Sequence, residues 1–207
     1  MPNFNDVVSQ FRIEGTVESV SPIGNGLINE TLRVKTVDAN TPDYILQRIN
    51  NAIFTDVDLL QHNIELVTDH IRHKLMEKGE TDIERKCLRF VQAKDGKTYY
   101  KDADDRYWRM SVFIPNAVTK EEVNPESAFC CGETFGNFQN MLVDLKEPLG
   151  ETIPDFHNME LRLRQLREAV SADKAGRVAS VKDMIAELES YADETCLAER
   201  LYREGVL

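Results

Sequence analysis

Hydrophobic and polar residues alternate along much of the first half of the chain, as in strands that bury one face. The alternation is weak over Phe11–Val20, clear over Thr31–Val37 and present again over Tyr44–Ile49. Turn-forming residues over Ser21–Gly26 and Asn40–Asp43 separate these segments. Consecutive strands joined by short turns usually pair with each other, so the pattern predicts an antiparallel meander.

A helical period follows the third strand. Apolar residues recur every three or four positions from Val57 to Leu75, Asp56 or Asp58 can cap the start, and Gly79 is a suitable stop. Strands return after this helix, over Cys87–Val91, Lys97–Lys101 and Tyr107–Ile114. The spacing therefore predicts a sheet with one long helix inserted in it.

The character of the chain changes near Asn116. Helical patterns occupy the rest of the sequence, over 126–145, 156–174, 181–191 and 197–202. We therefore expect an α+β protein of two parts: residues 1–116 with all the strands and one helix, and residues 117–207 with helices only.

Composition narrows the class of protein. Apolar residues make up 42% of the 207 residues and charged residues 29%, values typical of a globular protein with a core. No apolar run is long enough to span a membrane, and the N-terminal residues lack the features of a secretory signal. The four cysteines show no CxxC spacing. We expect a cytoplasmic protein with reduced thiols and no membrane partner.

Charge disfavours one class of partner. Lysine and arginine total 25 and acidic residues 36, giving a formal net charge of −11. Such a chain repels a phosphate backbone on average, so we expect no nucleic-acid partner.

The sharpest local feature is the turn Gly24–Asn25–Gly26 between the first two strands. A glycine-rich turn can place its backbone amides against phosphate groups. The chain has no GxxxxGK[ST] loop, and no GxGxxG opens a helix, so neither common nucleotide fingerprint is present. Taken alone, the turn also fits an ordinary connection between strands.

Two charged residues extend this feature. Arg48 lies on the third strand, on the face of Tyr44 and Leu46, where a cation beneath the turn would contact phosphate. A shift of one residue would put Gln47 there instead. Glu65 lies in the following helix and could pair with Arg48. Taken singly, both also fit solvated surface residues.

Several segments resemble one enzyme superfamily. They are Gly24–Thr31, Tyr44–Asn50, Ile53–Asp56 and Ile153–Asn158. Together they look like the aminoglycoside phosphotransferase and choline kinase superfamily, and within it most like the N-acetylhexosamine 1-kinase group. The resemblance implies a protein-kinase-like N-lobe, an antiparallel sheet plus one helix, followed by a partial all-helical C-lobe.

The resemblance also implies a reaction: transfer of the ATP γ-phosphoryl group to the anomeric hydroxyl of an N-acetylhexosamine, with Mg²⁺. Arg48 would stand where the family has a lysine, with Glu65 as its partner, and Ile114 would lie in the hinge that meets adenine. The implied phosphate-covering backbone belongs to Gly24, Asn25, Gly26, Leu27, Ile28 and Asn29.

One family feature is missing. None of the four histidines begins an HxD sequence, so the catalytic loop and the later metal-binding aspartate are absent, and we assign neither catalytic residues nor metal ligands. We expect these 207 residues to form the first part of a kinase, inactive alone, and to self-associate through exposed helices of the C-lobe.

Other functions stay open. A choline, homoserine or aminoglycoside kinase of the same fold is one alternative. A non-enzymatic acidic module that binds a nucleotide or a protein is another, and the glycine-rich turn would then be only a turn.

Overall fold

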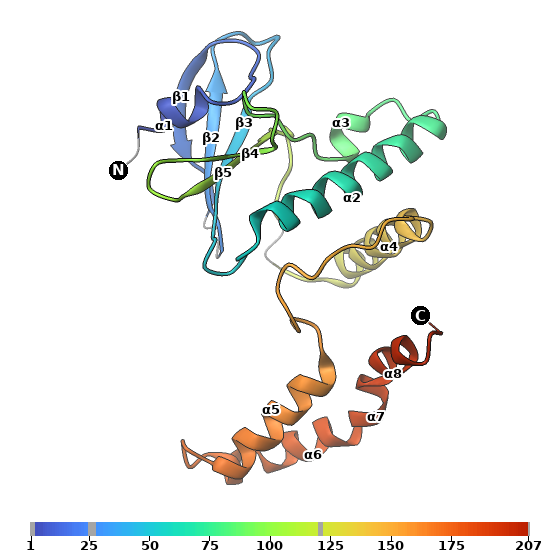
Figure 1. Cartoon of the computed structure of the whole chain (residues 1–207). Coiled ribbons are helices and arrows are strands. Elements are labelled where there is room, and N and C mark those ends of the chain that lie inside the picture. Colours follow the sequence, from blue (N-terminus) through green and yellow to red (C-terminus); the bar gives the residue numbers. More distant parts are fainter. Residues whose placement is uncertain (1–2, 25–27, 120–121, 207) are drawn as a thin grey trace. The chain divides into compact units, whose positions relative to one another are not determined.

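Figure 1 shows a computed structural model that describes residues 3–24, 28–119 and 122–206. The chain divides into two compact units, Met1–Thr152 and Ile153–Leu207. The first unit contains, in chain order, α1 (Phe4–Val8), β1 (Val17–Pro22), β2 (Glu30–Thr36), β3 (Tyr44–Ile49), α2 (Val57–Glu77), α3 (Ile83–Lys86), β4 (Tyr99–Lys101), β5 (Tyr107–Val112) and α4 (Pro125–Leu142).

The strands form one sheet in the order β1-β2-β3-β5-β4, and every neighbouring pair is antiparallel. The predicted meander of the first three strands and the α+β class are both confirmed. The register aligns Leu32 with Leu46 and Leu46 with Met110, so these three side chains share one face of the sheet.

That face carries the larger core. Leu32, Leu46 and Met110 pack with Val8 of α1 and with Trp108, which is fully buried. The expected strand from Phe11 to Val20 forms only from Val17 onward, because Phe11 is instead buried with Val7 and Val8 of α1 against this face. Phe11 makes a single bridge to Ala93.

Helix α2 covers the opposite face of the sheet. Leu60 packs with Ile49 of β3 and Tyr99 of β4 in a second core cluster. The carboxylate of Asp56 accepts a hydrogen bond from the Leu59 amide at 2.8 Å, which confirms the predicted cap. Alternation along β3 explains the division: its even-numbered residues face the α1 side and its odd-numbered residues the α2 side.

The chain between α2 and β4 was expected to contain a strand at Cys87–Val91. It makes only an isolated bridge, Phe90 to Ser111, and Cys87 instead packs against Ile71 and Leu75 of α2. Strand β5 ends at Val112, two residues before the predicted end.

Helix α4 belongs to the first unit because Met141 and Leu142, at its end, join the cluster of Ile71 and Leu75 on α2. The compact units therefore divide after Thr152 and not at Asn116, where the strand-forming composition ends. Whether residues 1–116 and 117–207 correspond to kinase lobes stays a prediction.

The second unit is entirely helical over its described residues. It contains α5 (Met159–Ala172), a 3₁₀ turn (Val178–Val181), α6 (Lys182–Ser190), α7 (Ala192–Thr195) and α8 (Leu197–Arg203). Ion pairs connect these helices: Arg167 of α5 binds Glu189 of α6 at 2.6 Å, and Arg203 of α8 binds Glu160 of α5. Across the described parts of both units, no helix has the length and apolar character needed to cross a bilayer.

Candidate nucleotide site

The glycine-rich turn connects β1 and β2, as predicted. Gly24 has a φ of 68°, which favours glycine, and a Cβ placed on it would meet no atom within 4 Å. Ile28 is half exposed, while the Asn29 side-chain oxygen accepts a hydrogen bond from the Asn50 amide at 3.0 Å. Gly24 and Ile28 therefore lie in open surroundings, and Asn29 is held at the end of β3. The predicted residues Asn25, Gly26 and Leu27 lie outside the described residues.

Arg48 does not occupy the predicted environment. It shares the face of Tyr44 and Leu46, and that face is the one covered by α1. Its exposed guanidinium pairs with Glu30 at 3.5 Å, whereas Glu65 accepts a hydrogen bond from the Thr98 hydroxyl at 2.5 Å. The expected Arg48–Glu65 ion pair was therefore wrong, because the two residues belong to opposite sides of the sheet.

A different polar row lies on the α2 face. Arg109 of β5 donates from Nε to the Gln47 side-chain oxygen at 3.0 Å, and the Gln47 amide nitrogen donates to the Thr31 hydroxyl at 3.1 Å. The row crosses β5, β3 and β2 and ends next to the glycine-rich turn. Sequence reasoning missed Arg109, since only the pairing of Gln47 with Arg109 in the register puts it there.

Arg109 lies in an unusual environment for a cation. Its partial burial lowers the pKa of the guanidinium, whose Cζ lies over the Phe90 ring at 5.8 Å from the ring centre. No carboxylate lies within 4.0 Å of it among the residues that the structure describes. A hollow of about 380 Å³ opens beside it, lined mainly by apolar residues of α2 together with Phe90 and Thr152.

Glu65 borders a separate, smaller hollow of about 230 Å³ between α2 and the chain before β4. Its partner Thr98 also accepts a hydrogen bond from the buried amide of Gln61 at 3.0 Å. These contacts fix the crossing of α2 over β4, which is a structural role for Glu65.

The predicted hinge directly follows β5. The Phe113 amide donates to the Asp43 carbonyl at 2.8 Å, and the Arg85 side chain donates to the Pro115 carbonyl at 2.8 Å. Ile114 lies between these two anchors and is partly buried. Within the described chain, no hydrogen bond engages the Ile114 backbone, so its amide and carbonyl are free to meet a ligand.

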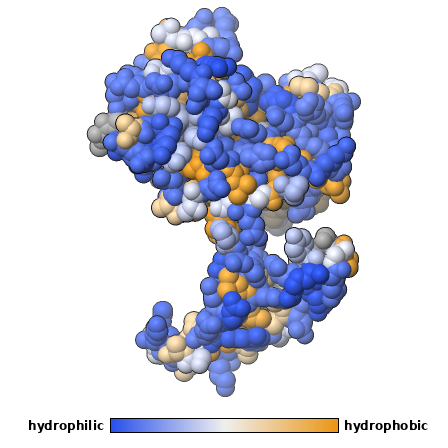
Figure 2. Space-filling model, viewed as in Figure 1, coloured by the Kyte–Doolittle hydropathy of each residue, from blue (hydrophilic) through white to orange (hydrophobic). Residues whose placement is uncertain are grey.

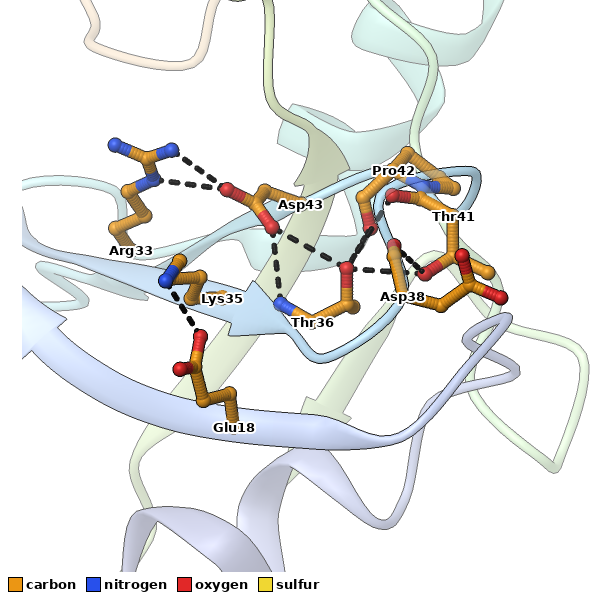
Figure 3. Close-up of polar contacts among 8 residues, drawn as sticks. All are labelled: Glu18, Arg33, Lys35, Thr36, Asp38, Thr41, Pro42 and Asp43. Atoms are coloured by element: carbon orange, nitrogen blue, oxygen red, sulfur yellow. Dashed lines mark hydrogen bonds and ion pairs between the residues drawn. The ribbon is translucent and has the colours of Figure 1, made fainter.

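A polar cluster at the β2–β3 turn supports this hinge (Figure 3). Asp43 accepts hydrogen bonds from Arg33 at 2.6 Å and from the Thr36 amide at 2.9 Å. Burial opposes its ionisation, but the hydrogen bonds from Thr36 and Arg33 outweigh burial and lower the pKa of Asp43. Both cations of the cluster already have acidic partners, Arg33 in Asp43 and Lys35 in Glu18, so we assign the cluster to stability.

The donor groups fit a nucleotide better than a metal ion. The open surroundings of Gly24, the partly buried Arg109 guanidinium and the Ile114 backbone, which makes no hydrogen bond within the described residues, suit phosphate and adenine. Among residues 3–24, 28–119 and 122–206, no group of three His, Cys, Asp or Glu side chains could hold a metal, so we derive no step through Mg²⁺. No protein-family model matches the chain.

Proposed function

We propose that this chain forms the nucleotide-binding part of an ATP-dependent small-molecule kinase, with an N-acetylhexosamine as the acceptor class and the cytoplasm as its compartment. One observation carries the proposal. Gly24, with a positive φ and open surroundings, lies in the connection between β1 and β2, at the end of an antiparallel sheet whose third and fifth strands present a polar row toward α2.

In this proposal, the backbone around Gly24 covers the phosphates and the backbone of Ile114 meets the adenine. The acceptor class comes from the resemblance of the Gly24–Thr31 and Tyr44–Asn50 segments alone. The catalytic aspartate would have to come from outside these 207 residues, so the chain itself is proposed to bind ATP without transferring phosphate.

Titration calorimetry with ATP tests the binding role. Gly24 and Gly96 both have positive φ and open space around the missing Cβ, so alanine should strain the two backbones similarly. We expect Gly24→Ala to weaken ATP binding about tenfold, a loss of ~1.4 kcal/mol, and the matched control Gly96→Ala to leave it within twofold.

Two results would contradict the proposal. One is a wild-type chain that does not bind ATP at millimolar concentration. The other is an equal loss of affinity in the Gly24 and Gly96 variants, which would indicate a general effect on folding.

A further inference from the structure

We infer that Arg109, positioned by Gln47, is the cation that binds the nucleotide phosphates, in place of a cation on β3. This inference rests on the proposed function. It moves the phosphate-binding charge from the third strand to the fifth, across the Gln47–Arg109 pair of the register.

The charge of Arg109 favours an anionic ligand. A guanidinium stays protonated in proteins, so partial burial of Arg109, with no carboxylate partner among the described residues, leaves a positive charge that has lost much of its hydration. Most other cations near the sheet already have acidic partners: Arg48 pairs with Glu30, Lys97 with Asp58 and Lys101 with Asp105. An anionic ligand would supply the charge that Arg109 lacks.

The orientation of the Arg109 guanidinium also suits phosphate. The Nε atom of Arg109 is bound to Gln47, which leaves the two terminal nitrogens of the guanidinium as donors. Gln47 is itself fixed by the Thr31 hydroxyl, so its oxygen must face Arg109 and its nitrogen must face β2. This arrangement pre-orients a fork of donors suited to phosphate oxygens.

The hollow beside Arg109 offers space for a ligand. The hollow beside Arg109 is bordered by Leu60, Ile64 and Val67 of α2 and by Phe90. A cation at the edge of an apolar hollow is a weakly hydrated donor, and its hydrogen bonds to phosphate are stronger there than in water. Arg48, half exposed on the other face, has no such advantage.

The test measures binding of ATP, adenosine and inorganic tripolyphosphate to the 207-residue chain by calorimetry. We expect Arg109→Gln to weaken ATP and tripolyphosphate at least tenfold and to change adenosine less than twofold. Arg109→Lys should give an intermediate loss, because it keeps the charge but not the fork. Arg106→Gln is the matched control: it removes an arginine next to the same strand that is paired with Asp104.

Gln47→Leu tests the positioning role. It should weaken ATP binding in the wild-type chain and add no further loss in the Arg109→Gln background, as a double-mutant cycle would show. Independent, additive losses would overturn the claim that Gln47 acts through Arg109.

The possible outcomes separate this inference from the proposed function. If the wild type binds ATP and Arg109→Gln binds it equally well, the inference fails and the proposed function stands; a selective loss in Arg48→Gln would return the role to β3. If the wild type binds tripolyphosphate through Arg109 but not ATP, the anion site stands and the proposed function fails. Binding of neither ligand would overturn both.

Discussion

At the scale of single residues, Asp43 shows how one residue can link neighbouring strands through both its side chain and its backbone. Its carboxylate binds Arg33 and the Thr36 amide, and its own carbonyl receives the Phe113 amide after β5. We expect Asp43→Asn to reduce the free energy of unfolding by about 2 kcal/mol at neutral pH, the usual size for hydrogen bonds to a charged group. Chemical denaturation measures this loss.

The pH dependence of that loss follows from the lowered pKa of Asp43. The stabilisation is present above the unfolded-state pKa of about 4 and disappears as the pH falls through the lower folded-state value. The difference between wild type and Asp43→Asn should therefore shrink below about pH 4. Asp105→Asn, which breaks only the exposed pair with Lys101, is the control and should cost little. A constant difference down to pH 2 would contradict the assignment.

The sequence alone could identify the turn at Gly24 and the third strand, but not the cation that accompanies them. Alternation along β3 was enough to place Arg48 with Tyr44 and Leu46 on one face. Helix α1 covers that face and leaves the opposite face to α2. Alternation could not predict this, because α1 has only five residues and gives no strong helical signal. Arg109 could be found only once β3 and β5 were paired, a contact between residues far apart in sequence.

At the scale of elements, α2 organises the first unit. Besides covering the sheet, it holds the chain after α4: Asn63 exchanges two hydrogen bonds with Gly150 at 2.7 and 3.1 Å, and His70 and Lys74 both bind Asp144. A Cβ on Gly150 would lie 2.5 Å from Cδ1 of Leu59, so any other residue here would require the Leu59 side chain to move. This segment also borders the hollow beside Arg109 through Thr152.

We therefore expect Asn63→Ala to release the chain after α4 without unfolding the sheet. Leaving the Gly150 amide and carbonyl unpaired costs about 1 kcal/mol, so amide exchange over 141–152 should accelerate roughly fivefold. Hydrogen-exchange mass spectrometry measures this. The control is His73→Ala, because a ring nitrogen of His73 hydrogen-bonds to the Asp69 carbonyl within the same helix. Faster exchange throughout β2, β3 and β5 would instead indicate global destabilisation.

Elements with a long, regular apolar period were predicted well, and short ones were not. The stripe from Val57 to Leu75 predicted α2, and the choice of Asp56 or Asp58 as cap predicted its start to within two residues, because cap and stripe are local signals. The segment Cys87–Val91 had the composition of a strand, yet Cys87 is buried against α2 and leaves the sheet. Tertiary packing decides the secondary structure of such short segments, so their strand propensity alone does not predict it.

At the scale of the whole molecule, exposed apolar residues predict self-association. Met184, Leu188 and Tyr191 recur at helical spacing along and just after α6 and are 63%, 54% and 51% exposed. Apolar side chains reach the surface in both units (Figure 2). A continuous apolar stripe of this kind favours contact with another copy, while the net charge of −11 opposes it.

Apolar attraction and charge repulsion between copies of the chain respond differently to salt. Added salt screens the repulsion between acidic chains but strengthens apolar contact, so association should increase as the ionic strength rises from about 0.05 to 0.5 M. Sedimentation should show species heavier than 23.7 kDa, and Leu188→Lys should shift them toward the monomer. Glu187→Lys changes the charge of the same helix beside the stripe and should not dissociate the assembly. A monomer at every salt concentration would mean that the helices of the second unit satisfy their apolar faces within one chain.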